Sequence, residues 1–100
     1  MTKDEAVQLS ETKFWENMSY RDIATFQLFE EKLCMPFDVF HEALEKSLGR
    51  PVFTHELGLN LDSIKSEFLG DKEAPSFEDV INLIPQDKRI LVFFKKNNNL

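Results

Sequence analysis

The sequence CMPFDVFHEALEKSLGRP, residues 34–51, contains the clearest start and stop signals for a helix in this chain. Pro36 cannot continue a helix that precedes it, but it suits the first turn of a new one, so we expect a sharp corner there. Gly49 suits the left-handed residue that ends many helices. The pattern therefore predicts a helix from Phe37 to Leu48, whose aromatic side faces the core.

The opposite side of this predicted helix is acidic. Asp38, Glu42 and Glu45 follow one another at the spacing i, i+4 and i+7, which places three carboxylates along one face. A helix face of this kind is usually solvated. We expect these carboxylates to point into water and to be available to a partner.

Two further helices are predicted before this corner. Thr2 and Glu5 match a capping box, in which each side chain accepts the backbone N–H of the other residue. Ser19 with Asp22 is a shorter form of the same signal, and we expect a second, central helix from Tyr20 to Leu33 because its apolar residues cover more than one face. The first helix is expected to bury one face formed by Val7, Phe14, Trp15 and Met18.

Two more helices are predicted beyond residue 59. Apolar residues recur at helical spacing near residues 60–69, and Gly70 is the expected stop. Ser76 and Asp79 are expected to cap a short helix that Pro85 ends. The apolar residues of the first of these helices are Leu57, Leu61, Ile64 and Phe68.

Two segments have the character of strands. Residues 52–54 are β-branched and aromatic, and the sequence RILVFF at residues 89–94 is apolar without alternation, as in a strand covered on both faces. A lone strand leaves backbone groups unpaired, so we expect the two segments to pair. A short pairing leaves an edge that a second copy could cover, and a homodimer is an open alternative. The residues of this edge are Arg89, Ile90, Leu91, Val92, Phe93 and Phe94.

The composition is that of one folded domain. The chain has 100 residues, of which 42% are hydrophobic and 10 are Phe. A chain of this length buries about two-thirds of its unfolded surface, so we expect a single domain over residues 1–100 with an aromatic core and a frayed tail at 95–100. The predicted fold class is mainly α (α+β), with four to five short helices and a minor two-stranded β element.

The charge is negative and unevenly distributed. The formal net charge is −6, with 17 acidic residues against 8 Lys and Arg in residues 1–79 but one against four in residues 80–100. The acidic body would repel phosphates, so nucleic acid is not an expected partner. The single Cys34 excludes an internal disulfide, neither a signal peptide nor a membrane span is recognisable, and the expected location is the cytoplasm.

The corner at LCMPF raises the alternative of a helix-turn-helix regulator. In such a motif, residues near the start of the second helix enter the major groove of DNA. Here those residues include Asp38, His41, Glu42 and Glu45, whose carboxylates would weaken binding to DNA. A DNA-binding regulator is kept as the first alternative.

Metal binding and catalysis have little support. His41 and Glu45 lie one turn apart in HEALE, and His55 and Glu56 follow, but the zincin motif needs a second histidine where this chain has Glu45. Cys34 sits at a corner, where a cysteine is usually a small buried hydrophobe. We predict no metal, no cofactor and no enzymatic activity.

A binding role is therefore favoured. The phenylalanines could line a cavity, which leaves a small-ligand-sequestering protein as the second alternative, with Trp15 and Tyr20 as the first residues to examine in any pocket. The acidic surface could steer a basic partner, such as a nuclease or a nucleic-acid-binding protein. The predicted partner-binding residues are Glu30, Glu31, Asp38, His41, Glu42 and Glu45.

The sequences FQLFEEKLCMPFDVFHEALEKSLGRPVFTHELG and INLIPQDKRILVF resemble a family of small uncharacterised proteins carried by phages, prophages and mobile elements of bacteria. The resemblance covers roughly residues 19–94 and implies no catalytic residue. It implies a phage-type accessory protein in the cytoplasm of the host cell. We expect such a protein to act by protein–protein binding and to inhibit a host defence system.

Overall fold

The computed structural model describes residues 1–88. Within these residues the structure has six α-helices, two short 3₁₀ helices and no strand, so the mainly α prediction is confirmed and the minor β element is not supported. The elements are α1 (Lys3–Glu11), η1 (Phe14–Asn17), α2 (Tyr20–Leu28), α3 (Phe37–Leu48), α4 (Thr54–Leu59), α5 (Leu61–Leu69), α6 (Phe77–Asn82) and η2 (Gln86–Lys88).

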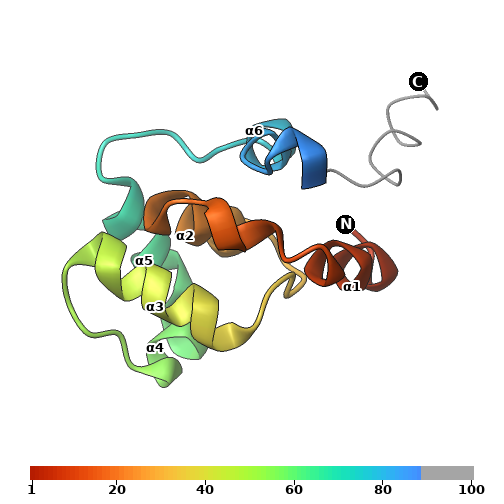
Figure 1. Cartoon of the computed structure of the whole chain (residues 1–100). Helices are drawn as coiled ribbons and strands as arrows, with labels where there is room; N and C mark the ends of the chain where they lie inside the picture. Colours follow the sequence, from red (N-terminus) through yellow and green to blue (C-terminus); the bar gives the residue numbers. More distant parts are fainter. Residues whose placement is uncertain (89–100) are drawn as a thin grey trace.

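Helix α2 is the centre of the arrangement, as predicted. It packs more extensively against α3 than any other pair of elements does, and it also contacts α6. Figure 1 shows α6 above α2, α3 in front, and α1 at the end of the molecule remote from α4. Helix α5 contacts both α3 and α4. Helix α2 therefore contacts both α3 and α6, and α5 packs on α3 and α4.

The core is aromatic at its centre. The rings of Phe14 and Phe26 lie 4.9 Å apart between centroids, and both side chains are fully buried. Phe40 of α3 and Phe68 of α5 are 6% and 4% exposed, so Phe40 faces inward as predicted, whereas Phe37 on the same helix is 38% exposed. Burying side chains of this size supplies most of the driving force for folding.

The first helix is shorter than the apolar pattern predicts. The capping box is present, because Thr2 Oγ1 accepts the Glu5 N–H at 3.1 Å and Glu5 accepts the Thr2 N–H at 2.7 Å. Lys13 has a φ of 53°, a left-handed conformation that separates α1 from η1. The predicted apolar face is therefore broken there, and Val7 is 49% exposed.

Helix α2 ends at Leu28 instead of continuing to Leu33. The side chain of Gln27 takes over the hydrogen bonds of the following loop. Its Nε2 donates to the Lys32 carbonyl at 2.8 Å, and its Oε1 accepts the Cys34 N–H at 2.7 Å. Because buried backbone groups must find partners, this side chain lets the chain leave the helix early.

Helix α3 has the predicted bounds. It begins at Phe37, directly after Pro36, and it ends at Leu48. Gly49 follows with a φ of 71°, and its N–H donates to the Glu45 carbonyl at 2.9 Å. A glycine adopts this left-handed conformation without the strain that a Cβ atom would cause.

The predicted strand at residues 52–54 is instead the end of a loop and the first residue of α4. Val52 is buried, and both of its backbone polar groups contact side chains of α3. Glu45 Oε2 accepts the Val52 N–H at 2.7 Å, and His41 Nε2 binds the Val52 carbonyl. The Val52 N–H, the one backbone donor of this residue, is therefore not available to a strand partner. The other predicted strand, residues 89–94, lies outside the described residues.

The remaining helices follow the predicted signals. Gly70 ends α5, and the pair Ser76 and Asp79 forms the capping box of α6 with both distances at 3.1 Å. Arg21 joins α2 to α5, because its Nη2 donates to the Phe68 carbonyl at 2.9 Å and its guanidinium lies 3.9 Å from the centre of the Phe68 ring. These contacts fix α5 against the central helix.

Candidate functional site

The structure separates the predicted partner-binding residues into three groups. The first is the pair His41 and Glu45, which lie on α3 and bind the loop after it. The second is Glu30 and Glu31 in the loop after α2, and the third is the pair Asp38 and Glu42, which line a surface pocket.

His41 and Glu45 hold a loop in place. A carbonyl only accepts hydrogen bonds, so His41 donates to Val52 through Nε2, and this nitrogen lies 3.7 Å from Glu45 Oε2. The two side chains remain 28% and 34% exposed, but their polar atoms point at the Val52 backbone. His41 and Glu45 thus support the loop after α3, and their role in partner binding stays a prediction.

Glu30 is buried at 9% exposure, which corrects the expectation that it lies on the acidic surface. Its Oε2 accepts the Lys32 N–H at 3.0 Å, and its Oε1 lies 3.6 Å from the amino group of Met1. The Glu30 carbonyl also accepts from Gln27 at 3.3 Å. This residue organises the loop after α2, whereas its neighbour Glu31 is exposed.

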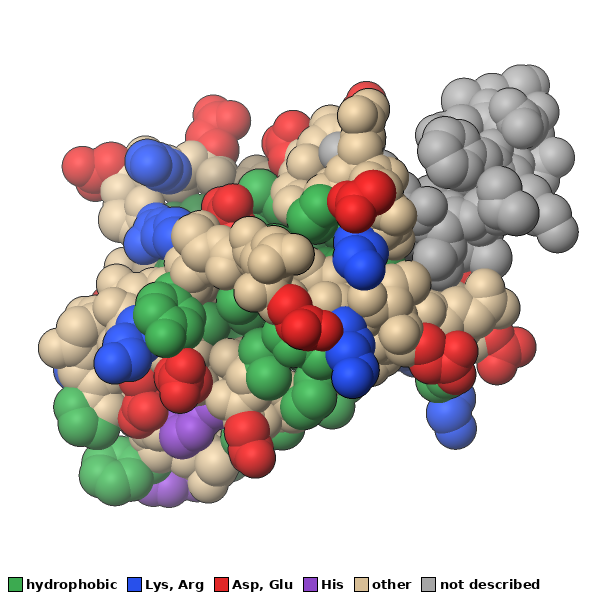
Figure 2. All heavy atoms as spheres, viewed as in Figure 1, with side chains coloured by type: hydrophobic (Ala, Val, Ile, Leu, Met, Phe, Trp, Pro, Cys, Tyr) green, Lys and Arg blue, Asp and Glu red, His purple; other side chains and the backbone are tan. Residues whose placement is uncertain are grey.

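Asp38 and Glu42 line a pocket together with the aromatic residues Trp15 and Tyr20. The pocket has a volume of about 410 Å³ and lies between η1, the start of α2 and the outer side of α3. Figure 2 shows Asp and Glu side chains over α3 beside an apolar patch on the same face of the molecule. We call this the acidic–aromatic pocket; its lining residues are Trp15, Glu16, Met18, Tyr20, Ile23, Asp38, Val39 and Glu42.

The wall of this pocket is fixed by the core beneath it. Phe14 is fully buried against Phe26, and Trp15 meets the Phe14 ring edge-on at 5.6 Å between centroids. The left-handed Lys13 turns the chain so that η1 lies beside α2. The spacing of Trp15 and Tyr20 in the sequence does not reveal this arrangement, because it depends on the break at Lys13.

The electrostatics of this pocket favour a cation. Glu16, Asp38 and Glu42 are all exposed at its edge. Lys46 Nζ lies 5.9 Å from the centre of the Tyr20 ring, so this ring already faces one positive charge of the protein. Three carboxylates against this single ammonium leave the pocket with an excess of negative charge.

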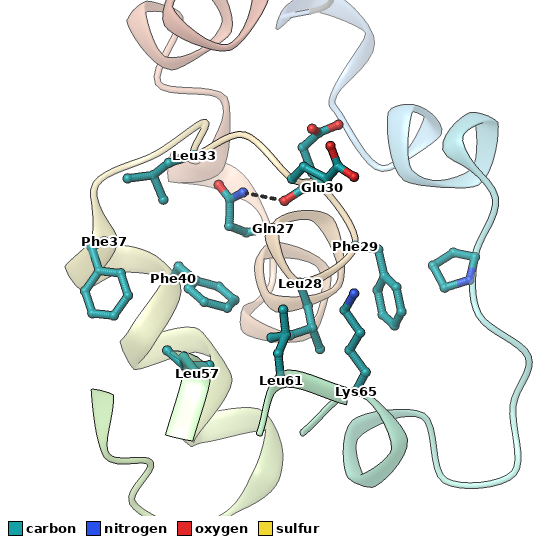
Figure 3. Close-up of a pocket in the computed structure, with 12 residues that line it drawn as sticks. Gln27, Leu28, Phe29, Glu30, Leu33, Phe37, Phe40, Leu57, Leu61 and Lys65 are labelled. Carbon is teal, nitrogen blue, oxygen red and sulfur yellow. Dashed lines mark hydrogen bonds between the residues drawn. The ribbon is translucent and has the colours of Figure 1, made fainter. Parts of the chain in front are cut away.

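A second hollow, of about 400 Å³, lies on the other side of α3. Figure 3 shows Phe37 and Phe40 of α3 facing Leu57 and Leu61 across it, with the end of α2 as the third wall. We call it the apolar groove. Its lining residues are Gln27, Leu28, Phe29, Glu30, Glu31, Leu33, Phe37, Phe40, Leu57, Leu61, Lys65 and Pro75.

The apolar groove is open to solvent. Leu33 is 55% exposed, and Phe37 and Leu61 are each 38% exposed. Its charged residues are few: Glu31 is exposed, Glu30 is buried, and Lys65 Nζ lies 5.6 Å from the centre of the Phe29 ring. Several large apolar side chains gathered around one hollow are typical of a surface that another segment covers.

Arg50, in the loop after α3, contacts one acidic residue of α4 and one of α5. Its Nε and Nη2 donate to the two carboxylate oxygens of Glu67 at 2.9 and 2.8 Å, and its Nη1 lies 3.5 Å from Glu56 Oε1. The hydrogen bond from Arg50 lowers the pKa of Glu67, and the Phe53 N–H, with Arg50 as a further cause, lowers the pKa of Glu56. This cluster ties the loop after α3 to α4 and α5.

Cys34 is fully buried, and burial raises its pKa to about 12, so it is a thiol at neutral pH. Its Sγ lies 3.2 Å from the Lys32 carbonyl. Among residues 1–88, no three His, Cys, Asp or Glu side chains come together in a way that could hold a metal ion. His41 binds the Val52 carbonyl, and the His55 ring stacks on the Phe53 ring at 5.7 Å between centroids.

The connection between α2 and α3 differs from that of a helix-turn-helix. Residues 29–36 join the two helices, whereas the turn of that motif has about three to four residues. Asp38 and Glu42 also remain exposed near the start of α3, where DNA phosphates would approach. Neither feature favours the DNA-binding alternative.

The described residues form a small, acidic, mainly helical domain in which the acidic–aromatic pocket and the apolar groove lie on different sides of α3. The chain belongs to the family Domain of unknown function (DUF7736), whose model matches residues 20–76. This match covers α2 to α5 and therefore the whole apolar groove. Trp15, Glu16 and Met18 of the acidic–aromatic pocket lie before it.

No curated protein and no solved structure matches the chain. Across residues 1–88, none of the helices has both the length and the apolar character that crossing a membrane requires. The family match confirms a family of unknown function, and the phage setting stays a prediction.

Proposed function

We propose that this protein is a protein-binding module that captures a Lys or Arg side chain of its partner in the acidic–aromatic pocket. The observation that carries this proposal is the meeting of three carboxylates and two aromatic rings in one hollow. Asp38 and Glu42 come from α3, whereas Trp15 and Tyr20 come from the segment before and at the start of α2. The fold thus brings together residues that are far apart in the sequence, such as Trp15 and Asp38.

The chemistry of this pocket suits a guanidinium or an ammonium group. A cation over the face of Trp or Tyr gains about 0.5–2 kcal/mol, depending on how far it is desolvated. Carboxylates at the edge add charge-assisted hydrogen bonds, and the planar Arg group can bind one carboxylate through two N–H groups. Because Glu16, Asp38 and Glu42 are exposed, they also speed the approach of a basic partner at low salt.

The resemblance to phage-carried proteins gives this proposal a setting. In a host cell, basic surfaces with accessible Arg and Lys belong to nucleases and to other proteins that hold nucleic acid. A small acidic domain that occupies such a surface would block it. We therefore propose a host protein of this kind as the partner and inhibition of host defence as the consequence; this step rests on the resemblance and on the charge.

Titration by NMR with the peptide Ac-Ala-Arg-Ala-NH₂ tests the pocket directly. We expect shifts of the Trp15 indole N–H and the Tyr20 ring, and much smaller shifts with citrulline, the neutral isostere of Arg. The double variant Asp38→Asn, Glu42→Gln should weaken binding by about tenfold, since about 1.4 kcal/mol corresponds to that factor.

A matched control keeps the same change of charge elsewhere. Asp71→Asn with Glu73→Gln removes two exposed carboxylates from the loop before α6. If this control weakens peptide binding as much as the pocket variant does, attraction by net charge explains the result and the pocket proposal is wrong. A pull-down from host lysate, compared between these two variants, then separates pocket-dependent partners from proteins that bind any acidic surface.

The small-ligand alternative has one observation in its favour. The apolar groove has the volume of a ligand site and carries Lys65 at its edge. Lys65 lies over the Phe29 ring, and Glu31 is exposed at the same groove, so an anionic ligand would meet both charges. The apolar walls of the groove and the negative charge of Glu31 beside Lys65 favour an apolar polypeptide segment over a small anion as its ligand.

A further inference from the structure

We propose that Lys46 is an internal cation of the acidic–aromatic pocket and competes with the partner's Arg or Lys side chain for the Tyr20 ring. The inference deepens the proposed function of this pocket, on which it rests, by naming a residue that limits its affinity. Lys46 lies in the last turn of α3, and Tyr20 is the first residue of α2, the helix against which α3 packs.

Lys46 lies beside the ring that an entering cation has to reach. Its Nζ is 5.9 Å from the centre of the Tyr20 ring, within the range of about 6 Å over which a ring attracts a cation. Tyr20 is one wall of the pocket, and Glu42, one helical turn before Lys46, is another. An Arg or Lys side chain that enters the pocket would therefore meet the ammonium of Lys46 at this ring.

The contact of Lys46 with Tyr20 is loose in comparison with that of Arg21. The guanidinium of Arg21 lies 3.9 Å from the centre of the Phe68 ring, and its Nη2 also donates to the Phe68 carbonyl at 2.9 Å. Lys46 is exposed, and among residues 1–88 no carboxylate lies within ion-pair distance of its ammonium. Because a lysine side chain has four rotatable bonds, the contact with Tyr20 can be exchanged for that of another cation without a change of fold.

A third hollow, of about 390 Å³, gives the Lys46 side chain a place to move to. It lies at the end of α3 beside Gly49, and Lys46 lines it together with Glu42 and Glu45. Glu42 lines both this hollow and the acidic–aromatic pocket, so the two hollows share a wall. An ammonium that leaves Tyr20 on this side keeps carboxylates as its neighbours, which favours its displacement by a partner.

The charges of the pocket give the direction of the effect. Glu16, Asp38 and Glu42 line the pocket, and the ammonium of Lys46 is a like charge that opposes the entry of a second cation. Without the charge of Lys46, the three carboxylates and the Tyr20 ring are left to the partner. We expect this loss of charge to tighten the binding of a basic peptide by about two- to fivefold, the size of an exposed cation–π contact.

A purely structural role of Lys46 leads to a different expectation. A basic residue in the last turn of a helix is favoured by the helix dipole, and Lys46 holds this position in α3. If that were its only role, Lys46→Gln would lower the Tm slightly and would not tighten the binding of a peptide. Affinity and Tm measured on the same variant therefore separate the two roles.

Titration by NMR with Ac-Ala-Arg-Ala-NH₂ at fixed ionic strength tests the competition in the full chain. Lys46→Gln should bind the peptide about two- to fivefold more tightly than the native sequence, whereas Lys46→Arg, which keeps the charge, should show no such gain. Lys72→Gln removes the same charge from the loop after α5 and is the matched control. An unchanged or weaker affinity in Lys46→Gln, or an equal gain in Lys72→Gln, would overturn the inference while leaving the binding of the peptide by the pocket intact.

The Lys46 side chain provides a second readout, which begins without peptide. The ring current of Tyr20 should shift the ε-methylene protons of Lys46 upfield, and both Tyr20→Leu and saturating peptide should abolish that shift. An unshifted signal in the native chain, or a shift that persists in the presence of bound peptide, would show that Lys46 is not the competitor. If the upfield shift is present but neither the native chain nor Lys46→Gln binds the peptide, the proposed function is wrong and the competitor role of Lys46 is wrong with it.

Discussion

The two sides of helix α3 differ in what they offer to a partner, although their residues alternate along the same sequence. Asp38, Val39 and Glu42 face the acidic–aromatic pocket, whereas Phe37 and Phe40 face the apolar groove. One side is exposed, charged and lined by residues from the N-terminal part of the chain. The other is apolar and lined by α4, α5 and the loop after α2. A single helix thus separates a surface for cations from a surface for apolar segments.

A third side of the same helix belongs to neither surface. His41 and Glu45 bind the backbone of Val52, so their polarity serves the loop that leads into α4. The comparison teaches that acidic residues at regular helical spacing need not share a role. Glu42 and Glu45 are three positions apart and both line a hollow near the end of α3, yet only Glu45 completes the hydrogen bonding of the buried Val52 and only Glu42 reaches the acidic–aromatic pocket.

The largest expected effect separates the buried wall of the groove from its rim. Phe40→Ala removes a ring that is 6% exposed and should lower the free energy of unfolding by about 3–5 kcal/mol in urea denaturation. Phe37→Ala removes a ring that is 38% exposed and should cost less than half of that. Equal losses would show that Phe37 belongs to the core and that the groove is not an open surface.

The next effect concerns the loop that forms one end of the groove. Gln27→Glu keeps the size of the side chain but replaces the amide that donates to the Glu30 and Lys32 carbonyls. Because the Glu30 and Lys32 carbonyls then face a carboxylate, we expect a loss of about 2–3 kcal/mol at pH 7. Gln8→Glu on the exposed part of α1 is the control, with an expected change within about 0.5 kcal/mol. A similar result for both would mean that the loop is held by other contacts.

The helix signals were predictable from the sequence because they act locally. The box of Thr2 with Glu5, the pair Ser76 with Asp79, and Gly49 each depend on residues within one turn of each other. The bounds of α3 followed from such signals alone. The mainly helical class and an inward-facing Phe40 followed in the same way.

The predictions that were wrong share one cause: a side chain binds backbone groups that are distant in the sequence. Gln27 ends α2 through contacts with residues up to seven positions away, and His41 with Glu45 removes the predicted strand through Val52. Glu30 is buried because the same loop folds over it. The acidic–aromatic pocket was predictable only in parts, since Asp38, Trp15 and Glu42 were recognisable but the left-handed Lys13 that brings them together was not.

The pocket side and the loop side of α3 can be separated by one substitution at each position. Glu45→Ala leaves the N–H of the buried Val52 without its acceptor, and we expect a loss of about 1–2 kcal/mol in urea denaturation. Glu42→Ala has the same helix propensity change but removes an exposed carboxylate, so its effect should stay within about 0.5 kcal/mol. If Glu42→Ala is the more damaging of the two, the assignment of these residues to different sides of α3 is wrong.

The smallest effect is a pH dependence of the cluster that holds α4 and α5, the helices that complete the groove. The lowered pKa values of Glu56 and Glu67 mean that these carboxylates stabilise the fold while ionised. In the unfolded chain these carboxyl groups titrate at about pH 4.3. Their contribution to the stability of the fold is therefore complete above that pH, and it is lost as the pH falls through their lower folded pKa values. In Arg50→Met we therefore expect the Tm deficit relative to the native sequence to be largest near neutral pH and to shrink on acidification.

Lys72→Met, which removes an exposed charge from the loop after α5, should show a small difference that does not change with pH. A constant deficit in Arg50→Met would indicate that Arg50 acts through its contact with the Pro51 carbonyl and not through its ion pairs.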